Sequence, residues 1–155
     1  MKKFLSIASI LSILFSASIV AKEASSEKQA KANVQFRKAI LQLVRSNMGP
    51  LGAMAKGQIP YDSEVMMTNG LRIEQLSYMM EDYFATDTRK FELKTDASDD
   101  IWENQDDFNS LALDMADAAA KLQKVAEAGD EANYRKAIGS VGATCKACHD
   151  KYKTD

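Results

Sequence analysis

The sequence predicts an all-α protein whose helices form an antiparallel four-helix bundle with up-down-up-down topology. Four stretches carry apolar residues at every third or fourth position, the spacing that places them on one face of a helix. The connections between these stretches are mostly short, so consecutive helices should lie side by side and antiparallel. No strand pattern, internal repeat or low-complexity tract competes with this interpretation.

Residues 1–21 are predicted to be a secretory signal peptide rather than part of the fold. Met1–Lys3 is a positively charged start, Phe4–Val20 is apolar, and Ile19-Val20-Ala21 offers a peptidase cleavage site. A retained membrane anchor is the alternative, but the apolar run is serine-rich and near the lower length limit for spanning a bilayer. We therefore expect one exported, mature domain at residues 22–155.

The mature domain should be mildly acidic. The full sequence has a formal net charge of −2, and loss of Lys2 and Lys3 with the leader removes two positive charges and leaves −4. Because a negatively charged protein repels nucleic acid, no nucleic-acid partner is expected. The remaining length suits a single hydrophobic core.

The first helix is predicted from about Ser26 to Lys56. Ser26 and Gln29 have the spacing of a capping box. Pro50 should kink this helix because it lacks a backbone donor, and Gly57 should end it. Its inward face is predicted to carry Val34, Leu41, Val44, Met48 and Leu51. A second apolar flank, made of Phe36, Ile40 and Leu43, indicates a homodimer formed through the first two helices.

The second helix is predicted from Asp62, which is placed as its N-cap, to Phe84. The polar residues 86–98 should form the longest loop. A third helix should begin at Asp99, since acidic residues suit a helix N-terminus, and should end at Gly129.

The fourth helix, which Asp130 should cap, carries the motif that assigns a chemistry. Its predicted buried face comprises Tyr134, Ile138, Val141, Cys145, Cys148 and Tyr152. Cys145-x-x-Cys148-His149 is the attachment signature of c-type haem. The two thiols, one helical turn apart, form thioethers with the porphyrin, and the imidazole that follows binds the iron. We expect one covalent haem c per chain, with His149 as its protein metal ligand.

Two other interpretations of the cysteine pair are less favoured. A disulfide or a thioredoxin-like redox pair uses the same spacing, but the redox pair normally opens a helix that follows a strand. A zinc site would lack a usual fourth ligand, because His149 is the only histidine of the chain.

The other face of the iron must be covered from upstream, since only six residues follow His149. Arg37 is the one charged residue on the predicted inward face of the first helix, and a haem propionate would explain it; snorkelling to water is the alternative. Leu41 lies one turn further along the same face and has no lone pair, so it would leave the iron five-coordinate and high-spin. Met79 and Met80 are the alternative sixth ligands, although a methionine in a helical stripe usually fills the core.

These motifs together resemble the cytochrome c′ family. The resemblance rests on the terminal C-x-x-C-H motif, on the Phe36-Arg37 pair, on the segment MAKGQIPYD at residues 54–62 and on Ile101-Trp102. It implies His149 as the proximal ligand, Arg37 beside a propionate and Leu41 as an apolar shield of the distal face. The low-spin relatives in this family carry a methionine at the position of Leu41. One departure is Lys153, where family members often have arginine.

The expected function is therefore that of a periplasmic haem protein that binds nitric oxide or carbon monoxide at an open iron position and transfers electrons with redox partner proteins. Nitric oxide binds ferrous haem without a distal hydrogen bond, whereas retention of dioxygen is helped by a polar donor that Leu41 does not supply. No catalytic acid or base is evident, so an enzyme is not expected. The alternative is a low-spin, one-electron carrier with a methionine sixth ligand.

Overall fold

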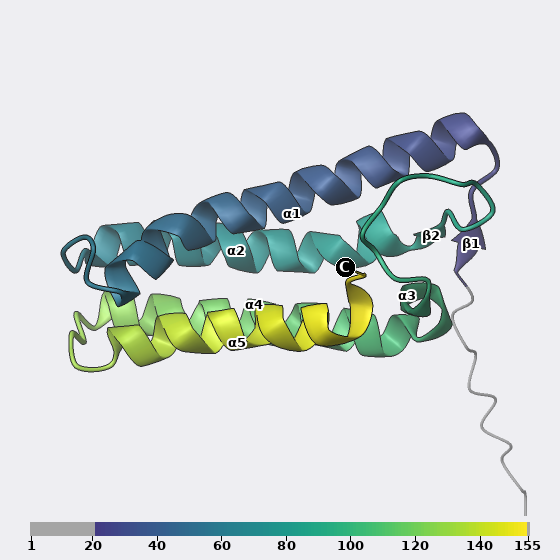
Figure 1. Cartoon of the computed structure of the whole chain (residues 1–155). Helices are drawn as coiled ribbons and strands as arrows, with labels where there is room; N and C mark the ends of the chain where they lie inside the picture. Colours follow the sequence, from purple (N-terminus) through teal and green to yellow (C-terminus); the bar gives the residue numbers. More distant parts are fainter. Residues whose placement is uncertain (1–20, 155) are drawn as a thin grey trace, which may run out of the picture.

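The computed structural model describes residues 21–154, in which four long helices form the predicted bundle (Figure 1). The helices are α1 (Glu27–Ala55), α2 (Ser63–Phe84), α4 (Gln105–Glu127) and α5 (Tyr134–Tyr152). In Figure 1, α1 and α2 lie above α4 and α5, and the long connection between α2 and α4 lies at the end of the bundle that also holds the C-terminus. The predicted leader lies outside the described residues except for Ala21. Within residues 21–154, no helix combines the length and the apolar character needed to cross a bilayer.

The first two helices begin where the sequence predicted. The side chain of Ser26 accepts a hydrogen bond from the Gln29 amide at 3.3 Å, and Asp62 accepts one from the Val65 amide at 3.0 Å. α1 continues through Pro50 to Ala55, and Gly57 follows it in the left-handed conformation with φ of 71°.

The third helix differs from its prediction because it is broken at Asn104. A short helix α3 (Asp100–Glu103) precedes α4, and Asn104 between them has φ of −131° and ψ of 47°, outside the helical region. The break brings Trp102 and Gln105, one on each side of it, to the same acceptor: both donate to the carbonyl of Phe84, at 3.0 and 3.3 Å. A hydrogen bond to another helix leaves no sign in the spacing of apolar residues, so the sequence did not predict the break.

The fourth helix also starts later than predicted. Asp130 accepts hydrogen bonds from the amides of Ala132 and Asn133, at 3.1 and 3.2 Å, so it closes a turn before the helix. α5 itself begins at Tyr134 with Asn133 as its cap residue.

Two short strands were not expected from the sequence. β1 (Lys22–Glu23) pairs in parallel with β2 (Thr86–Asp87), and the Ala24 amide extends the ladder with a bond to the Asp87 carbonyl at 2.8 Å. Two-residue strands are too short to show an alternating pattern. They tie the start of the described chain to the loop after α2.

The buried face of α1 is rotated from the predicted one. Ile40 is 3% exposed, whereas Leu41, predicted to point inward, is 43% exposed. The buried positions of this helix are Ala30, Val34, Arg37, Ile40, Val44, Asn47, Leu51 and Met54. Their spacing of three and four residues is regular, but it passes through Arg37 and Asn47. A prediction based on apolar residues alone therefore selected Leu41 in place of Ile40.

Candidate haem site

The haem-attachment motif lies in the last two turns of α5. Cys145 and Cys148 are both partly buried and pack against the core, and His149 is exposed beside them. The rest of the predicted buried face is confirmed, because Tyr134, Ile138, Val141 and Tyr152 are all buried.

The two thiols are free, and their surroundings keep them protonated. The Cys145 sulfur lies 4.0 Å from the Met115 sulfur on α4. Burial raises the pKa of the Cys145 thiol, and it raises that of Cys148 to about 11, with Cys145 and Asp107 adding to the effect on Cys148. At neutral pH both groups are thiols rather than the thiolates that attack disulfides.

The donor set fits a haem better than a metal ion held by the protein alone. In residues 21–154 no cluster of three or more His, Cys, Asp or Glu side chains is arranged to hold a metal. A haem iron needs only one protein ligand on the proximal side, because the porphyrin occupies the four in-plane positions. Cys145 and Cys148 are unpaired, lie one helical turn apart, and are followed directly by an exposed imidazole. These residues match what covalent haem attachment requires.

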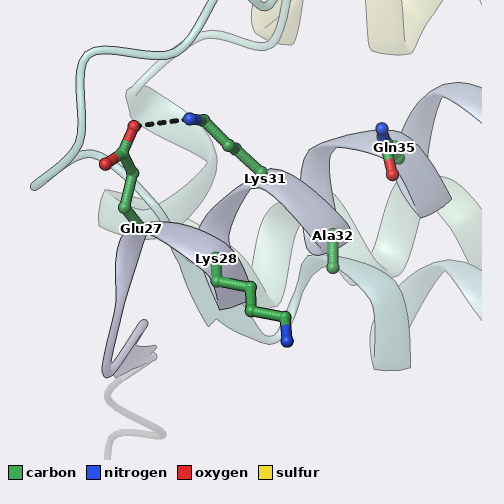
Figure 2. Close-up of a pocket in the computed structure, with 5 residues that line it drawn as sticks. All are labelled: Glu27, Lys28, Lys31, Ala32 and Gln35. Carbon is green, nitrogen blue, oxygen red and sulfur yellow. Dashed lines mark ion pairs between the residues drawn. The ribbon is translucent and has the colours of Figure 1, made fainter.

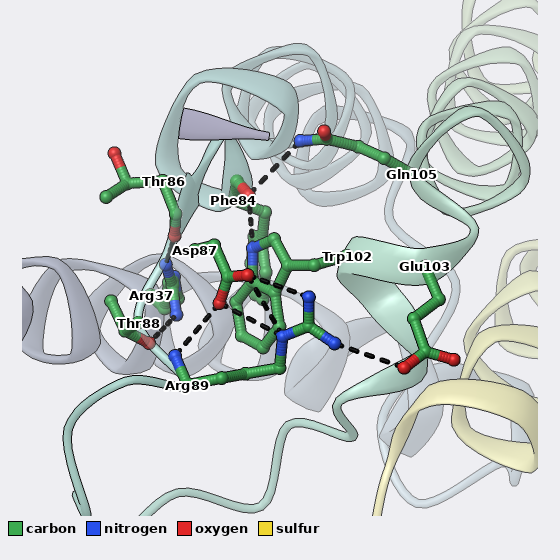
Figure 3. Close-up of polar contacts among 9 residues, drawn as sticks. All are labelled: Arg37, Phe84, Thr86, Asp87, Thr88, Arg89, Trp102, Glu103 and Gln105. Atoms are coloured by element: carbon green, nitrogen blue, oxygen red, sulfur yellow. Dashed lines mark hydrogen bonds and ion pairs between the residues drawn. The ribbon is translucent and has the colours of Figure 1, made fainter. Parts of the chain in front are cut away.

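Arg37 is held inside the protein by acceptors from the end of α2 and from the α2–α3 connection, and Figure 3 shows those of the connection. Its guanidinium donates to the carbonyl of Tyr83 at 2.9 Å, to the hydroxyl of Thr88 at 3.0 Å, and to the carbonyl of Thr86. Arg37 is 2% exposed, so the alternative in which it snorkels to water is wrong.

Two aromatic rings complete the surroundings of Arg37. The guanidinium carbon lies 5.2 Å from the ring centroid of Phe84 and 4.8 Å from that of Trp102. Both are distances at which a cation is attracted to an aromatic face. Burial lowers the pKa of Arg37 to about 10, although Asp87 opposes this shift, so the side chain stays charged at neutral pH.

A second arginine lies beside this group. Arg89 binds the Asp87 carboxylate through Nε and Nη2, at 3.0 and 2.8 Å, and reaches Glu103 through Nη1 at 3.1 Å. Its guanidinium carbon lies 5.9 Å from the Trp102 ring centroid (Figure 3).

We call the residues that surround Arg37 the Arg37 cradle: Tyr83, Phe84, Thr86, Asp87, Thr88, Arg89 and Trp102. Residues 86–98 were predicted only as a polar loop, so the Arg37 cradle was not expected from the sequence.

Asp87 should contribute stability only above strongly acidic pH. Burial raises its pKa, but the hydrogen bonds from Arg89 and the charges of Arg89 and Arg37 outweigh burial, and the net pKa lies below the usual 3.8. The stabilisation is present above the unfolded-state pKa and is lost as the pH falls through the lowered value. We expect Asp87→Asn to reduce the free energy of unfolding by about 1 kcal/mol at pH 7. Urea titrations at pH 7 and pH 2.5 check this: the gap between variant and native protein should shrink at pH 2.5, and an equal gap at both pH values would contradict it.

The residues predicted for the distal side lie in different surroundings. Leu41 is 43% exposed, so the protein core does not enclose it. Met80 is 4% exposed and belongs to the core. Met79 lines a surface groove between α1 and α2, and the full lining of this groove is Leu43, Asn47, Arg72, Gln75, Leu76 and Met79. No residue of α5 lines this groove, which disfavours Met79 as an iron ligand.

A further surface depression lies on the first turns of α1 (Figure 2). It is lined by Glu27, Lys28, Lys31, Ala32 and Gln35, all from one helix. Its one ion pair joins Glu27 and Lys31 at 2.7 Å, with both side chains 60% exposed. None of the predicted haem residues lines it, so it is a solvated helix face rather than the site.

The family model and the similar proteins and structures described next all carry the name cytochrome c′. The family model described as Cytochrome C′ matches residues 32–153. Cytochrome c′ from Cereibacter sphaeroides is 36% identical over 122 residues, which are 77% of this chain and 81% of the relative. The solved structure of cytochrome c prime from Shewanella frigidimarina superposes with a TM-score of 0.74 at 32% identity, covering 84% of this chain and all of that one. A nitric oxide complex of a leucine-to-alanine variant of cytochrome c prime from Alcaligenes xylosoxidans gives a TM-score of 0.69 at 32% identity, covering 81% of this chain and 96% of that one.

Proposed function

Because this chain belongs to the cytochrome c′ family, whose members carry c-type haem, we propose that it binds small diatomic gases at the open iron position of its haem. Cys145 and Cys148 hold the porphyrin through thioethers, and His149 ligates the iron. The observation that carries this assignment is the pair of unpaired, core-facing thiols followed directly by an exposed imidazole. When bound, the haem supplies an iron that takes up nitric oxide or carbon monoxide and exchanges one electron with a redox partner.

Leu41 keeps the distal position open. Its side chain offers only hydrocarbon, so it excludes charged ligands and gives a bound gas no hydrogen bond. The relative from Alcaligenes xylosoxidans has been solved as nitric oxide complexes of two variants in which a leucine is replaced, which supports nitric oxide as a ligand for a member of this family. The burial of Met80 in the core and the position of Met79 in the α1–α2 groove favour this function over the low-spin carrier.

The spin state of the iron tests this proposal most directly. The purified protein should show a high-spin, five-coordinate ferrous spectrum that changes on addition of nitric oxide or carbon monoxide. Intact-mass measurement should find one haem on a chain that begins at Lys22. A low-spin spectrum with a methionine-to-iron charge-transfer band would overturn the open site in favour of the electron carrier.

Arg37 is the residue we assign to a haem propionate. A guanidinium has five N–H donors, and three of those of Arg37 bind Tyr83, Thr86 and Thr88, so two are left for a carboxylate. The cradle fixes its orientation, which lowers the entropy cost of a bidentate contact.

Loss of the Arg37 charge should lower the reduction potential of the haem. A nearby cation favours the ferrous state, which carries one positive charge fewer than the ferric state. We expect Arg37→Gln to shift the midpoint downward by about 40 mV, equivalent to about 1 kcal/mol for one electron. A spectroelectrochemical titration measures this, and Arg45→Gln, which removes an exposed arginine from the same helix, is the control. Equal midpoints for Arg37→Gln and the native protein would remove the propionate contact from the proposal.

The proposed cellular location is the periplasm, and the proposed assembly is a homodimer. Residues 1–21 direct the chain to the periplasm, where c-type haem is attached in bacteria, and are cleaved there. The α1–α2 surface is the proposed homodimer contact, because both helices carry exposed apolar side chains, among them Phe36, Leu43 and Tyr78, which are 54%, 53% and 52% exposed. Sedimentation equilibrium of the haem-loaded protein should give twice the chain mass. With no catalytic acid or base assigned to the site, we propose gas binding and electron transfer rather than enzymatic turnover.

A further inference from the structure

We propose that Tyr152 is a positioning residue for the haem iron. By fixing the last turn of α5, Tyr152 sets how the imidazole of His149 meets the iron and therefore the strength of the iron–histidine bond. This inference rests on the proposed function, in which His149 is the proximal ligand. Tyr152 follows His149 by three residues and is the last residue of α5, so both share one helical turn.

The side chain of Tyr152 is anchored to α4. Tyr152 is 6% exposed, and its hydroxyl donates to the Asp107 carboxylate at 2.6 Å. Its ring meets the ring of Phe108 edge-on, with centroids 5.5 Å apart and planes at 79°. The hydrogen bonds from Tyr152 and Lys151 lower the pKa of Asp107, so this carboxylate is an ionised acceptor at neutral pH. An ionised acceptor strengthens the bond to the tyrosine hydroxyl.

The main chain after His149 is held as well. The Lys153 amide donates to the His149 carbonyl at 3.2 Å, and Lys153 forms an antiparallel bridge with Ala97. The Ser98 amide donates to the Tyr152 carbonyl, and the Thr154 amide donates to the Asp96 carbonyl, each at 2.9 Å. The last carbonyls of a helix ordinarily lack protein partners. Here residues 96–98 pair with residues 152–154, so the end of α5 is fixed on a second side.

The packing of Tyr152 on α4 also leads to the Arg37 cradle. The Phe108 ring, which contacts Tyr152, lies 4.6 Å from the Phe84 ring, and Phe84 in turn lies 5.2 Å from the Arg37 guanidinium. Tyr152 is therefore linked through Phe108 and Phe84 to the residues that hold Arg37. A histidine on a turn held in this way follows the iron less freely, and the protein imposes the geometry of the bond.

Tyr152→Phe isolates the hydroxyl contact, because it keeps the ring and its packing on Phe108. The matched control is Tyr134→Phe, which changes a tyrosine that is also 6% exposed on the same helix but at its other end. In haem-loaded ferrous protein, resonance Raman spectroscopy should show a shifted iron–histidine stretching frequency for Tyr152→Phe and an unchanged one for Tyr134→Phe. Hydrogen exchange of the Lys153 and Thr154 amides should accelerate about fivefold in Tyr152→Phe alone, as expected for loss of one hydrogen bond.

Faster exchange with an unchanged stretching frequency would overturn the proposal, because Tyr152 would then stabilise the helix end without affecting the iron. If Tyr152→Phe fails to fold or to take up haem, Asp107→Ala removes the same bond from the α4 side. Lys151→Met is its control, since it removes only the exposed ion pair between Lys151 and Asp107. Equal shifts in Asp107→Ala and Lys151→Met would also overturn the role of the tyrosine. An iron–histidine band missing from the native protein would instead refute His149 as the ligand, and thus the proposed function.

Discussion

The double variant Cys145→Ser, Cys148→Ser should carry no covalent haem after expression in a haem-maturing periplasm. Serine hydroxyls do not form the thioether bonds, so the porphyrin would be held only by non-covalent contacts. Intact mass measured under denaturing conditions should fall by one haem relative to the native protein. Each single variant should retain one thioether and a cofactor that survives denaturation.

The helical bundle itself should persist in this double variant. Neither cysteine makes a disulfide, and the core around them is formed by apolar side chains from all four long helices. Far-ultraviolet circular dichroism of the variant provides the control. Haem that stays attached under denaturing conditions in the double variant would refute attachment through Cys145 and Cys148.

Leu41→Met should convert the iron from five-coordinate and high-spin to six-coordinate and low-spin. Methionine is close to leucine in size but offers a thioether lone pair, which ligates haem iron. A gas ligand would then have to displace the sulfur. We expect the affinity for carbon monoxide to fall at least about tenfold, equivalent to about 1.4 kcal/mol. Optical spectra of the ferric and ferrous states, together with carbon monoxide titrations, measure both effects.

Leu43→Met is the matched control for this experiment. Leu43 lies two residues away on the same helix, is 53% exposed, and lines the α1–α2 groove instead. It should leave the spectrum and the carbon monoxide affinity unchanged. If Leu41→Met also left them unchanged, Leu41 would not lie over the iron and another residue would have to be found for the distal face.

Much of the fold could be predicted because its determinants are local. The caps at Ser26 and Asp62 and the left-handed glycine at Gly57 each act within a few residues of a helix end, and the structure confirms all three. The break at Asn104 was missed because the acceptor that Trp102 and Gln105 share, the carbonyl of Phe84, comes from another helix. The choice of Leu41 over Ile40 for the core failed for a related reason, since the buried face of α1 passes through the polar residues Arg37 and Asn47.

The sequence by itself determined the fold class and the expected chemistry of this protein: four amphipathic helices predict a bundle, and a C-x-x-C-H motif on the last of them predicts covalent haem with a histidine ligand. Only the tertiary structure decided how Arg37 and the end of α5 are held. The acceptors of Arg37 lie 46 to 51 residues away along the chain, and the acceptor of Tyr152 lies 45 residues away. Residue periodicity reports which face of a helix is apolar, whereas these hydrogen bonds depend on which backbone and side-chain groups the packed helices bring together.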